Sequence, residues 1–596
     1  MELADRAHAF QAMVAMRDGA RLNTFVFLPQ SGGPRWPVIV HRTPYGITAS
    51  DASDKTDYTR AWLPSAEEPF RGSILRGWRN IVAHGYAAVY QDTRGRHGSE
   101  GEDRVYADDA ADGCDTLEWI ATQSWTNQMV GMSGSSAGAT TTFAAASTRH
   151  PSLRAFFAQA GASSIYDDVV YEGQSIEMER LWLWVARNIP GLSLSHREAA
   201  MQRSGISAEA LDAAAASAAA RYARLDAARQ AEVPFIGSAD WMRLPLTRYP
   251  DFATWQPFLD EIITHPGSDA FRARHNFRHT IDIPGFHVTT WFDIFQTSVL
   301  AAFNDIQART GTQKLWIGPN EHSFVYASIF WPRDPYFEWF DYWLKGVATG
   351  IMDRPAVYYS PRAWIDDRVG YAPNDWRHAE RWPPPGTSPH WLYLRGDGNL
   401  ATDGPNGAPR SYRYDPHRPI PTLGGRNMLI DAGPRDQRPA QSLPDYGLIY
   451  RSETLREDLM IAGAVRATLH VQSGCPDTDF VVKLIEVEPD GRTMLLMDGV
   501  TRAMYRDPSG EPRPLVPERI ERVTVDLGHI HHTFRAGHCV EVDVTSSNFP
   551  RRARNTNSGH PVLADDGEAD IRVANNTIHH AAATPSFIEL PVLTRR

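Results

Sequence analysis

Short apolar runs alternate with helical periodicity through much of the first half of the chain. The runs have the length and composition of buried β-strands, and they stand at residues 37–41, 85–91, 153–161, 283–291 and 314–318. Between them, residues 107–122 carry apolar side chains at helical spacing. Strands that alternate with helices predict a parallel β-sheet covered by helices on both faces. Before this sheet, residues 8–30 alternate around a turn at 17–19, which predicts a β-hairpin.

The alternation breaks between residues 163 and 283. Here the chain becomes helical and irregular, with an alanine-rich stretch at 208–231 and several tryptophans. We interpret this segment as a helical cap over the carboxyl edge of the sheet, where open α/β sheets bind ligands. A separate helical domain is the alternative. After the sheet resumes, a helix at about 335–344 ends at a lysine and a glycine, which is typical of a helix C-terminus.

Beyond residue 351, Pro- and Gly-rich turns separate short β-type runs. The clearest of these runs are residues 467–471, 480–484 and 540–544. Their pattern predicts an all-β sandwich of the jelly-roll type. The predicted organisation is therefore an α/β core formed by residues 1–162 and 284–350, a helical cap at 163–283 and a jelly roll at 351–596.

Composition narrows the class of protein. The chain has 596 residues, 42% of them hydrophobic, which is enough for several cores. A net charge of −11 provides no basic surface for nucleic acid or an anionic membrane, so we expect neither partner. The first residues lack the pattern of a signal peptide, and no stretch of about 18 apolar residues exists. Three widely spaced cysteines are typical of a reducing compartment. We expect a cytoplasmic protein and leave a homo-oligomer open.

A serine stands at the apex of a predicted strand–turn–helix unit. Residues 134–138 read Gly-Ser-Ser-Ala-Gly, after a short apolar run and before small, helix-compatible residues. Glycine two residues to either side of Ser136 is typical of a nucleophile elbow, because the strained turn leaves no room for bulk there. Ser133 would lie inside the strand, and Ser135 lacks both glycines. Ser136 is therefore the candidate nucleophile.

A base and an acid for this serine follow at the ends of the next strands. Asp293 comes directly after the run at 283–291, and His322 follows the run at 314–318. A serine hydroxyl needs a base, and the base needs a carboxylate that fixes its tautomer. The order serine, acid, histidine at successive strand ends is that of α/β-hydrolases. We expect these three residues to form a catalytic triad that needs no cofactor and no metal.

Many spaced motifs resemble one family, the cocaine esterase and X-prolyl dipeptidyl-peptidase group of α/β-hydrolases. The matching motifs are Met16-Arg17-Asp18-Gly19, Arg42-Thr43-Pro44-Tyr45, Gln91-Asp92-Thr93-Arg94-Gly95, Ser99-Glu100-Gly101, Gly131-Met132-Ser133-Gly134-Ser135-Ser136, Trp291-Phe292-Asp293, Gly318-Pro319-Asn320-Glu321-His322-Ser323, Asp477-Thr478-Asp479-Phe480, Pro489-Asp490-Gly491 and Ser546-Ser547-Asn548-Phe549-Pro550-Arg551. They extend over almost the whole chain. The resemblance implies a hydrolase core, a helical cap and a C-terminal jelly roll, which is the architecture that the hydrophobic pattern predicts.

The resemblance also implies an oxyanion hole that the sequence pattern alone does not provide. In this family a tyrosine hydroxyl donates beside the backbone N–H that follows the nucleophile, and the matching positions are Tyr45 and Ala137. The chain departs from the family in two places. Ala137 replaces a tyrosine that usually follows the nucleophile, and Thr290 stands where glycine is common. Substrate specificity therefore cannot be copied from a relative.

The residues after Asp293 bear on the charge of the substrate. Relatives that hydrolyse α-amino acid esters have acidic residues two and three positions after the triad aspartate, where this chain has Phe295 and Gln296. An ammonium would lose hydration there without a carboxylate in return. Asp167 and Asp168 could supply charge, although we expect them to cap the following turn. With cap tryptophans such as Trp182 near the site, we predict a small-molecule substrate with an uncharged aromatic or aliphatic acyl group.

Several alternatives stay open at this point. Within enzymes they are an X-prolyl dipeptidyl-peptidase and a β-lactam acylase or α-amino acid ester hydrolase. Outside enzymes, the chain could be a binding protein that uses the jelly roll and carries a vestigial core. A histidine cluster at His529, His531 and His532 has no carboxylate nearby in the sequence, so we expect an exposed strand surface there and no metal site.

Overall fold

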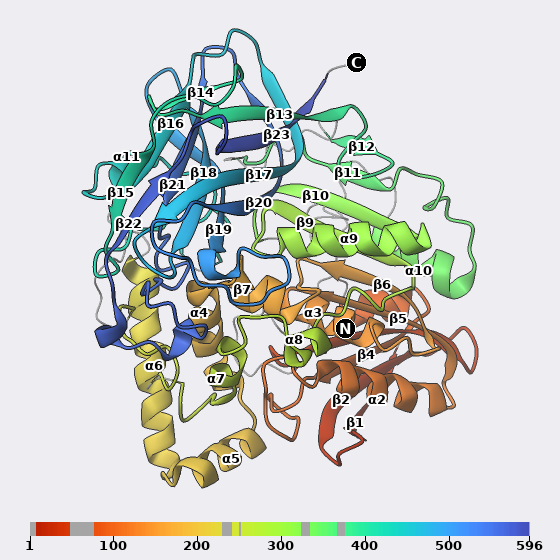
Figure 1. The fold of residues 1–596 in the computed structure, drawn as a ribbon. Helices are drawn as coiled ribbons and strands as arrows, with labels where there is room; N and C mark the ends of the chain where they lie inside the picture. The colour runs from red at the N-terminus through yellow and green to blue at the C-terminus, as the bar shows by residue number, and fades with distance from the viewer. Residues whose placement is uncertain are drawn as a thin grey trace.

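The computed structural model describes residues 7–47, 77–228, 241–249, 252–322, 334–365, 376–428 and 430–594. Its first half is built on a ten-stranded sheet (Figure 1). The strands are β1 (Ala7–Ala15), β2 (Arg21–Pro29), β3 (Trp36–Thr43), β4 (Ala87–Asp92), β5 (Thr126–Ser135), β6 (Leu153–Gln159), β9 (Gly285–Phe292), β10 (Gln313–Glu321), β11 (Val357–Tyr359) and β12 (Arg377–Ala379). Their spatial order is β1-β2-β4-β3-β5-β6-β9-β10-β11-β12. The neighbours from β4 to β11 run parallel, and β1 and β2 form the expected hairpin.

Helices cover both faces of this sheet, because successive side chains along each strand point alternately into two apolar cores. In β3, Val38 and Val40 point into one core, and Ile39 points into the other. The helices of the first face are α2 (Asp109–Thr122), α3 (Ala137–Ala146) and α9 (Gln296–Thr310). Those of the second face are α1 (Trp78–Ala83) and α10 (Pro335–Lys345). This confirms the doubly covered α/β core.

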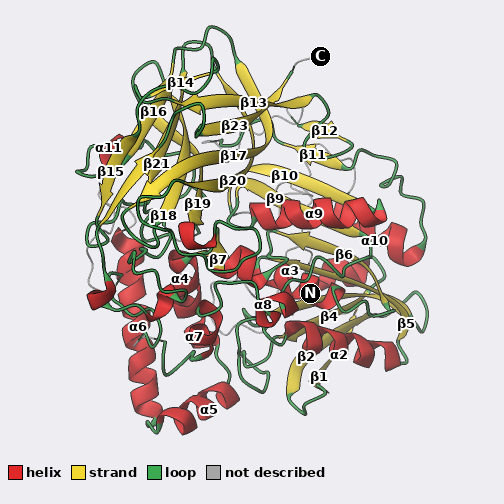
Figure 2. Ribbon diagram, in the orientation of Figure 1, coloured by secondary structure: helices red, strands yellow, loops and turns green. Residues whose placement is uncertain are grey.

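The segment between β6 and β9 is the helical cap, seen in Figure 2 as a group of red helices. After a π-helical turn at Tyr166–Val170 it forms the short hairpin β7 (Tyr171–Glu172) and β8 (Ser175–Ile176). Its helices are α4 (Met178–Asn188), α5 (Leu194–Ser204), α6 (Ala208–Ala228), α7 (Phe258–Ile263) and α8 (Ala270–Arg274). Buried residues of these helices continue the core of the first sheet face, so the cap packs on the sheet as an insertion.

The C-terminal part is all-β, as expected. Its main sheet contains β13 (Thr387–Leu394), β14 (Asn399–Ala401), β15 (Arg410–Tyr414), β16 (Leu448–Ser452), β17 (Leu459–Ser473), β18 (Asp479–Val487), β19 (Thr493–Arg502), β20 (Glu521–Phe534), β21 (Cys539–Thr545), β22 (Ala574–Ile578) and β23 (Phe587–Leu593). A short helix, α11 (Arg438–Gln441), interrupts these strands. The strands follow the order β15-β22-β17-β23-β13-β14-β16-β21-β18-β19, and β20 also pairs with β17. Within the described residues, no helix is long and apolar enough to cross a membrane.

The boundary between the two sheets differs from the expected one at residue 350. Strand β11 pairs in parallel with β10, and β12 then pairs with β11, so two strands from beyond residue 350 complete the first sheet. Their pairing is possible because β10 is otherwise an open edge of the core.

The expectation of an exposed histidine surface is wrong. His531 is 1% exposed, and its ring packs 5.3 Å from that of Tyr359. His529 accepts a hydrogen bond from the indole of Trp382 (3.1 Å). Strand β20 carries His529 and His531 to the junction of the two sheets, where burial lowers the pKa of each of these two to about 4.

Candidate active site

Ser136 lies at the sharp turn between β5 and α3. Its backbone has φ 54° and ψ −122°, a conformation that L-residues rarely adopt. The glycines around it are required by close approach. A Cβ atom on Gly134 would lie 2.0 Å from the carbonyl oxygen of Gly138, and one on Gly138 would lie 3.2 Å from that of Arg42. The local sequence therefore forms the elbow that holds the serine above the sheet.

His322 and Asp293 meet Ser136 at this edge of the sheet. The Nε2 atom of His322 is 3.0 Å from Oγ of Ser136, and its Nδ1 is 2.7 Å from Oδ1 of Asp293. Asp293 is fully buried, and its carboxylate also accepts hydrogen bonds from the backbone N–H of Phe295 (3.0 Å) and the hydroxyl of Thr289 (2.8 Å). The carboxylate is fixed from three directions and in turn fixes the imidazole. The structure thus brings together the three residues expected to form the triad.

The other two serines of the motif have different surroundings. Ser133 is fully buried in β5, where its hydroxyl contacts Tyr336 (2.8 Å) and the ring of His41. Ser135 ends the strand and is only partly exposed. Ser136 is the serine of this stretch whose bond to His322 the structure shows.

Two hydrogen-bond donors are expected for an oxyanion, the N–H of Ala137 and the hydroxyl of Tyr45. Ala137 is the first residue of α3, so its N–H has no acceptor within the helix. The hydroxyl oxygen of Tyr45 accepts a hydrogen bond from the indole of Trp184 (3.1 Å). A hydroxyl that accepts one bond keeps its own proton for another partner.

A small cavity opens at Ser136. The residues that line it are Val105, Tyr106, Ser136, Val169, Arg180, Leu181, Trp184, Phe295 and Met428. They come from the core, the cap and the C-terminal part. Most are apolar, and no carboxylate is among the described lining residues. This composition suits an uncharged group next to the serine.

The substrate-binding residues expected from the sequence fall into two groups. Phe295 lines the cavity, whereas Trp182 does not. Trp182 is fully buried inside the cap, with its ring edge-on to those of Tyr249 and Phe252. Trp184 lines the cavity instead, because residues 180, 181 and 184 share one face of α4 and residue 182 lies on another. The sequence holds no signal that separates the two tryptophans, because the packing of α4 decides which of its faces meets the cavity.

Gln296, Asp167 and Asp168 do not line the cavity. The amide of Gln296 donates to the carbonyl oxygens of Trp291 and His529, so it faces the C-terminal part. Asp167 forms an ion pair with Arg272.

The second aspartate is equally engaged. Asp168 accepts hydrogen bonds from the N–H of Ser164 (2.9 Å) and the hydroxyl of Ser298 (2.5 Å), and it lies 3.3 Å from Arg278. Ser164 precedes Asp168 in the chain, so the Asp168 carboxylate holds the start of this turn. The same carboxylate also contacts Arg278. Both carboxylates thus have partners of their own, and neither residue is among those that line the cavity.

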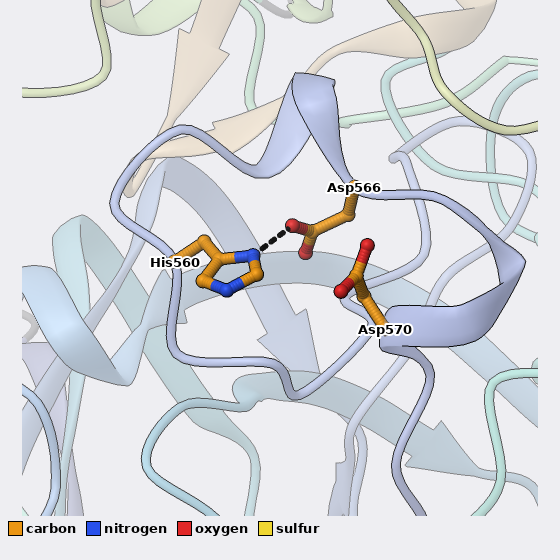
Figure 3. A group of neighbouring side chains, drawn as sticks. All are labelled: His560, Asp566 and Asp570. Atoms are coloured by element: carbon orange, nitrogen blue, oxygen red, sulfur yellow. Dashed lines mark hydrogen bonds and ion pairs between the residues drawn. The ribbon is translucent and has the colours of Figure 1, made fainter.

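The described residues contain one group of three side chains that could hold a metal, at His560, Asp566 and Asp570 (Figure 3). Hydrogen bonds already engage this group. Asp566 accepts from His560 (2.6 Å) and from the hydroxyl of Ser558 (2.6 Å), and Asp570 accepts from the N–H of Gly567 (2.8 Å). These contacts stabilise a loop of the C-terminal part.

Comparison with known proteins identifies the family of this chain. The X-Pro dipeptidyl-peptidase (S15 family) domain matches residues 18–324, and the X-Pro dipeptidyl-peptidase C-terminal non-catalytic domain matches residues 349–589. The chain is 31% identical to the cocaine esterase of Rhodococcus sp. (strain MB1 Bresler) over an alignment of 617 positions, gaps included, which covers 98% of this chain and 99% of that protein.

Two solved structures share the fold over nearly the whole chain. An α-amino acid ester hydrolase superposes with a TM-score of 0.71 at 23% identity, over 98% of this chain and 97% of the other. An aminopeptidase from a marine sediment archaeon, Thaumarchaeota archaeon, superposes with a TM-score of 0.70 at 22% identity, over 99% and 97%. The chain therefore belongs to the X-Pro dipeptidyl-peptidase (S15) family and is a serine hydrolase.

Proposed function

We propose that this chain hydrolyses carboxylic esters through an acyl-enzyme formed on Ser136. The contact of Ser136 with His322, and of His322 with Asp293, is the observation that carries the proposal. His322 accepts the proton as the Ser136 oxygen attacks the acyl carbon, and then gives it to the leaving alkoxide. Water attacks the acyl-enzyme in the same way, with His322 again as the base. Asp293 orients the imidazole and stabilises its protonated form.

The negative oxygen of the tetrahedral intermediate needs donors that are already in place. We assign this role to the N–H of Ala137 and the hydroxyl of Tyr45. The first belongs to the positive end of the α3 dipole. For the Tyr45 hydroxyl, the support is that the indole N–H of Trp184 donates a hydrogen bond to the tyrosine oxygen. The proton of Tyr45 is then directed to the substrate.

The acyl group is uncharged in this proposal. The cavity at Ser136 is lined mainly by apolar side chains, and Arg180 is the charged residue among the described ones. An ammonium placed there would lose its hydration and meet a cation, at a free-energy cost of kcal/mol order. Asp167 and Asp168 are engaged with Arg272 and Arg278. These contacts argue against α-amino acyl esters and against X-Pro dipeptides, both of which carry an ammonium close to the reacting carbonyl.

A pair of matched esters tests this assignment. We expect kcat/KM to be higher for a p-nitrophenyl ester of phenylacetic acid than for the ester of phenylglycine, which adds only the ammonium. Ser136→Ala should abolish turnover of both, whereas Ser147→Ala, at the far end of α3, should not. A phenylglycine advantage of about tenfold, lost on Asp167→Asn or Asp168→Asn, would contradict the proposal.

We also propose a cytoplasmic protein that acts without a nucleic-acid or membrane partner and without a cofactor. The free thiols of Cys114, Cys475 and Cys539 support a reducing compartment. The net charge of −11 argues against binding to polyanions. Size-exclusion chromatography with light scattering decides between a monomer and a homo-oligomer.

A further inference from the structure

Arg180 is the one charged side chain among the described residues that line the cavity at Ser136. It lies in the first turn of α4 and is 6% exposed. A buried guanidinium is costly in free energy unless it is paired and hydrogen-bonded. The groups that satisfy it therefore indicate what it holds in place.

Its two terminal nitrogens join the cap to the loop that carries Asp293. One donates to the carbonyl oxygen of Ile294 (3.0 Å), the residue directly after Asp293. The other donates to the carbonyl oxygen of Val169 (3.0 Å), which lines the cavity from the cap side. Arg180 thus fixes two backbone segments that no strand pairing holds together.

The same guanidinium packs on the next residue of the loop. It lies 5.4 Å from the ring centroid of Phe295, within the range of a cation–π contact. The backbone N–H of Phe295 donates to Asp293, and its ring meets the imidazole of His322 edge-on at 5.7 Å. Through Phe295, the position of Arg180 bears on both the acid and the base.

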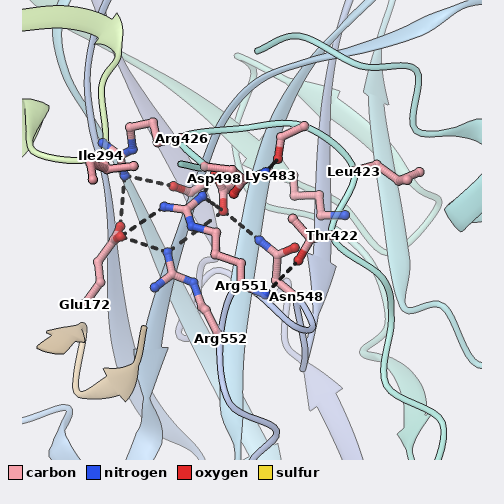
Figure 4. A network of polar contacts seen from close by, with 12 residues as sticks. Glu172, Ile294, Thr422, Leu423, Arg426, Lys483, Asp498, Asn548, Arg551 and Arg552 are labelled. Carbon is pink, nitrogen blue, oxygen red and sulfur yellow. Dashed lines mark hydrogen bonds and ion pairs between the residues drawn. The ribbon is translucent and has the colours of Figure 1, made fainter. Parts of the chain in front are cut away.

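On its other side Arg180 faces Glu177, with 3.6 Å between Nη2 and Oε2. Glu177 is in turn paired with Arg551 and Arg552, which belong to the C-terminal part. Figure 4 shows the neighbouring contacts, in which Arg551 and Arg552 also point toward Glu172 of the β7–β8 hairpin. The carboxylate that balances Arg180 is therefore held by arginines from another part of the molecule.

We propose that Arg180 is a positioning residue for the triad. It holds the turn after Asp293 against the cap, so that His322 stays aligned between Asp293 and Ser136, and Glu177 transmits the position of the C-terminal part to it. This inference rests on the proposed function, because it needs the triad to be the catalytic centre. Arg180 does not itself touch the reacting atoms.

The test compares Arg180→Met, which removes both hydrogen bonds and the charge, with Arg180→Lys, which keeps the charge and can reach one carbonyl. With neutral p-nitrophenyl butyrate we expect Arg180→Met to lower kcat by about 10- to 100-fold, the scale for a misaligned catalytic group, with KM within about threefold. Arg180→Lys should recover part of kcat. Arg187→Met, on the exposed end of the same helix, is the control and should behave as the parent.

Two further readouts separate positioning from a general loss of stability. The acidic limb of the kcat/KM profile should move in Arg180→Met, because the variant changes both the alignment of His322 with Asp293 and the charge behind Phe295, which a merely less stable enzyme would not show. If Arg180→Met does not fold, Glu177→Gln replaces it and should show the same loss in kcat with little change in KM.

Each remaining outcome has a definite meaning. An unchanged kcat and pH profile in a folded Arg180→Met would overturn the inference. So would a loss confined to KM for the p-nitrophenyl ester of succinic acid, because Arg180 would then bind an acidic acyl group. Failure of the proposed function looks different, since the parent itself would not hydrolyse the neutral ester or Ser136→Ala would retain turnover.

Discussion

Tyr45 and Trp184 form a pair beside the candidate nucleophile. The indole N–H of Trp184 donates to the tyrosine oxygen, and the Trp184 ring also stacks on Tyr106 at 5.6 Å. The indole thus holds the Tyr45 oxygen as an acceptor, and the proposed function assigns the proton of this hydroxyl to the oxyanion. Trp184 therefore contacts Tyr45, the proposed oxyanion donor, and also lines the cavity.

Tyr45→Phe should leave the fold intact and lower kcat by about 10²- to 10³-fold, the scale for loss of one oxyanion donor. The reason is that the ring remains and only the hydroxyl is lost. Steady-state kinetics on a p-nitrophenyl ester measure the effect, with Tyr342→Phe on α10 as the control. A raised KM with unchanged kcat would make Tyr45 a pocket residue.

The residues of the triad were predictable from sequence, and those of the pocket were not, apart from Phe295. Ser136, Asp293 and His322 each follow a strand of the same parallel sheet, so their order along the chain implies that they meet. Trp182 and Trp184 differ only in which side of α4 they occupy, which the packing of the helix against the rest of the cap decides. Asp167 and Asp168 find their partners at Arg272 and Arg278, more than a hundred residues away.

At the scale of elements, the turn from β5 to α3 places the nucleophile. The turn is tight enough that Gly134 approaches the backbone of Gly138, and Ser136 takes a positive φ angle. Because the helix begins directly after the serine, the N–H groups of its first turn point toward the site. Backbone geometry therefore supplies the N–H of Ala137, one of the two donors proposed for the oxyanion.

Gly134→Ala should therefore disrupt the elbow, since its Cβ would lie 2.0 Å from a backbone oxygen that cannot move alone. We expect a loss of about 1–3 kcal/mol in stability, typical of overpacking, and a much lower kcat in the folded fraction. Thermal unfolding and ester turnover measure the two effects. Gly474→Ala, where the added methyl meets open space, is the control. Parental activity in Gly134→Ala would refute this account of the turn.

Elements with a strong local signal were predicted well. The β1–β2 hairpin and the strands of the core follow the hydrophobic pattern. The strands β11 and β12 were missed because each spans only three residues and owes its existence to the open edge of β10. A sequence pattern cannot show an edge that only the assembled sheet creates.

At the scale of the whole molecule, the cavity depends on all three parts of the chain. The core supplies Ser136, the cap supplies Arg180 and Trp184, and the C-terminal part supplies Met428. Buried ion pairs such as Glu177–Arg552 join the cap to the C-terminal part. These pairs bring together residues about 375 positions apart in sequence, so no local sequence pattern predicts them.

Acid should destabilise the whole molecule in part through its buried histidines. Burial against Phe143, Phe156 and Phe303 lowers the pKa of His287 to about 4 from the ordinary 6.5. The unfolded chain then binds more protons than the folded one, so the stability from His287 is complete above pH 6.5 and disappears as the pH falls toward 4. The shift corresponds to about 3 kcal/mol.

The stability difference between the parent and His287→Gln isolates this contribution, because the other titrating groups are common to both. Thermal unfolding from pH 7 to pH 4 should show the advantage of the parent shrinking in that interval. An advantage that stays constant with pH would mean that His287 is not held neutral in the folded protein.

The most direct test of the account is to locate a covalent label at the nucleophile. A fluorophosphonate ester should modify one serine and stop turnover, and fragment-ion sequencing of the peptide should place the label on Ser136, next to His322. Ser136→Ala should take no label and hydrolyse no ester. A label on Ser133 or Ser135, or ester turnover that persists in Ser136→Ala, would contradict the assignment of Ser136 as the nucleophile.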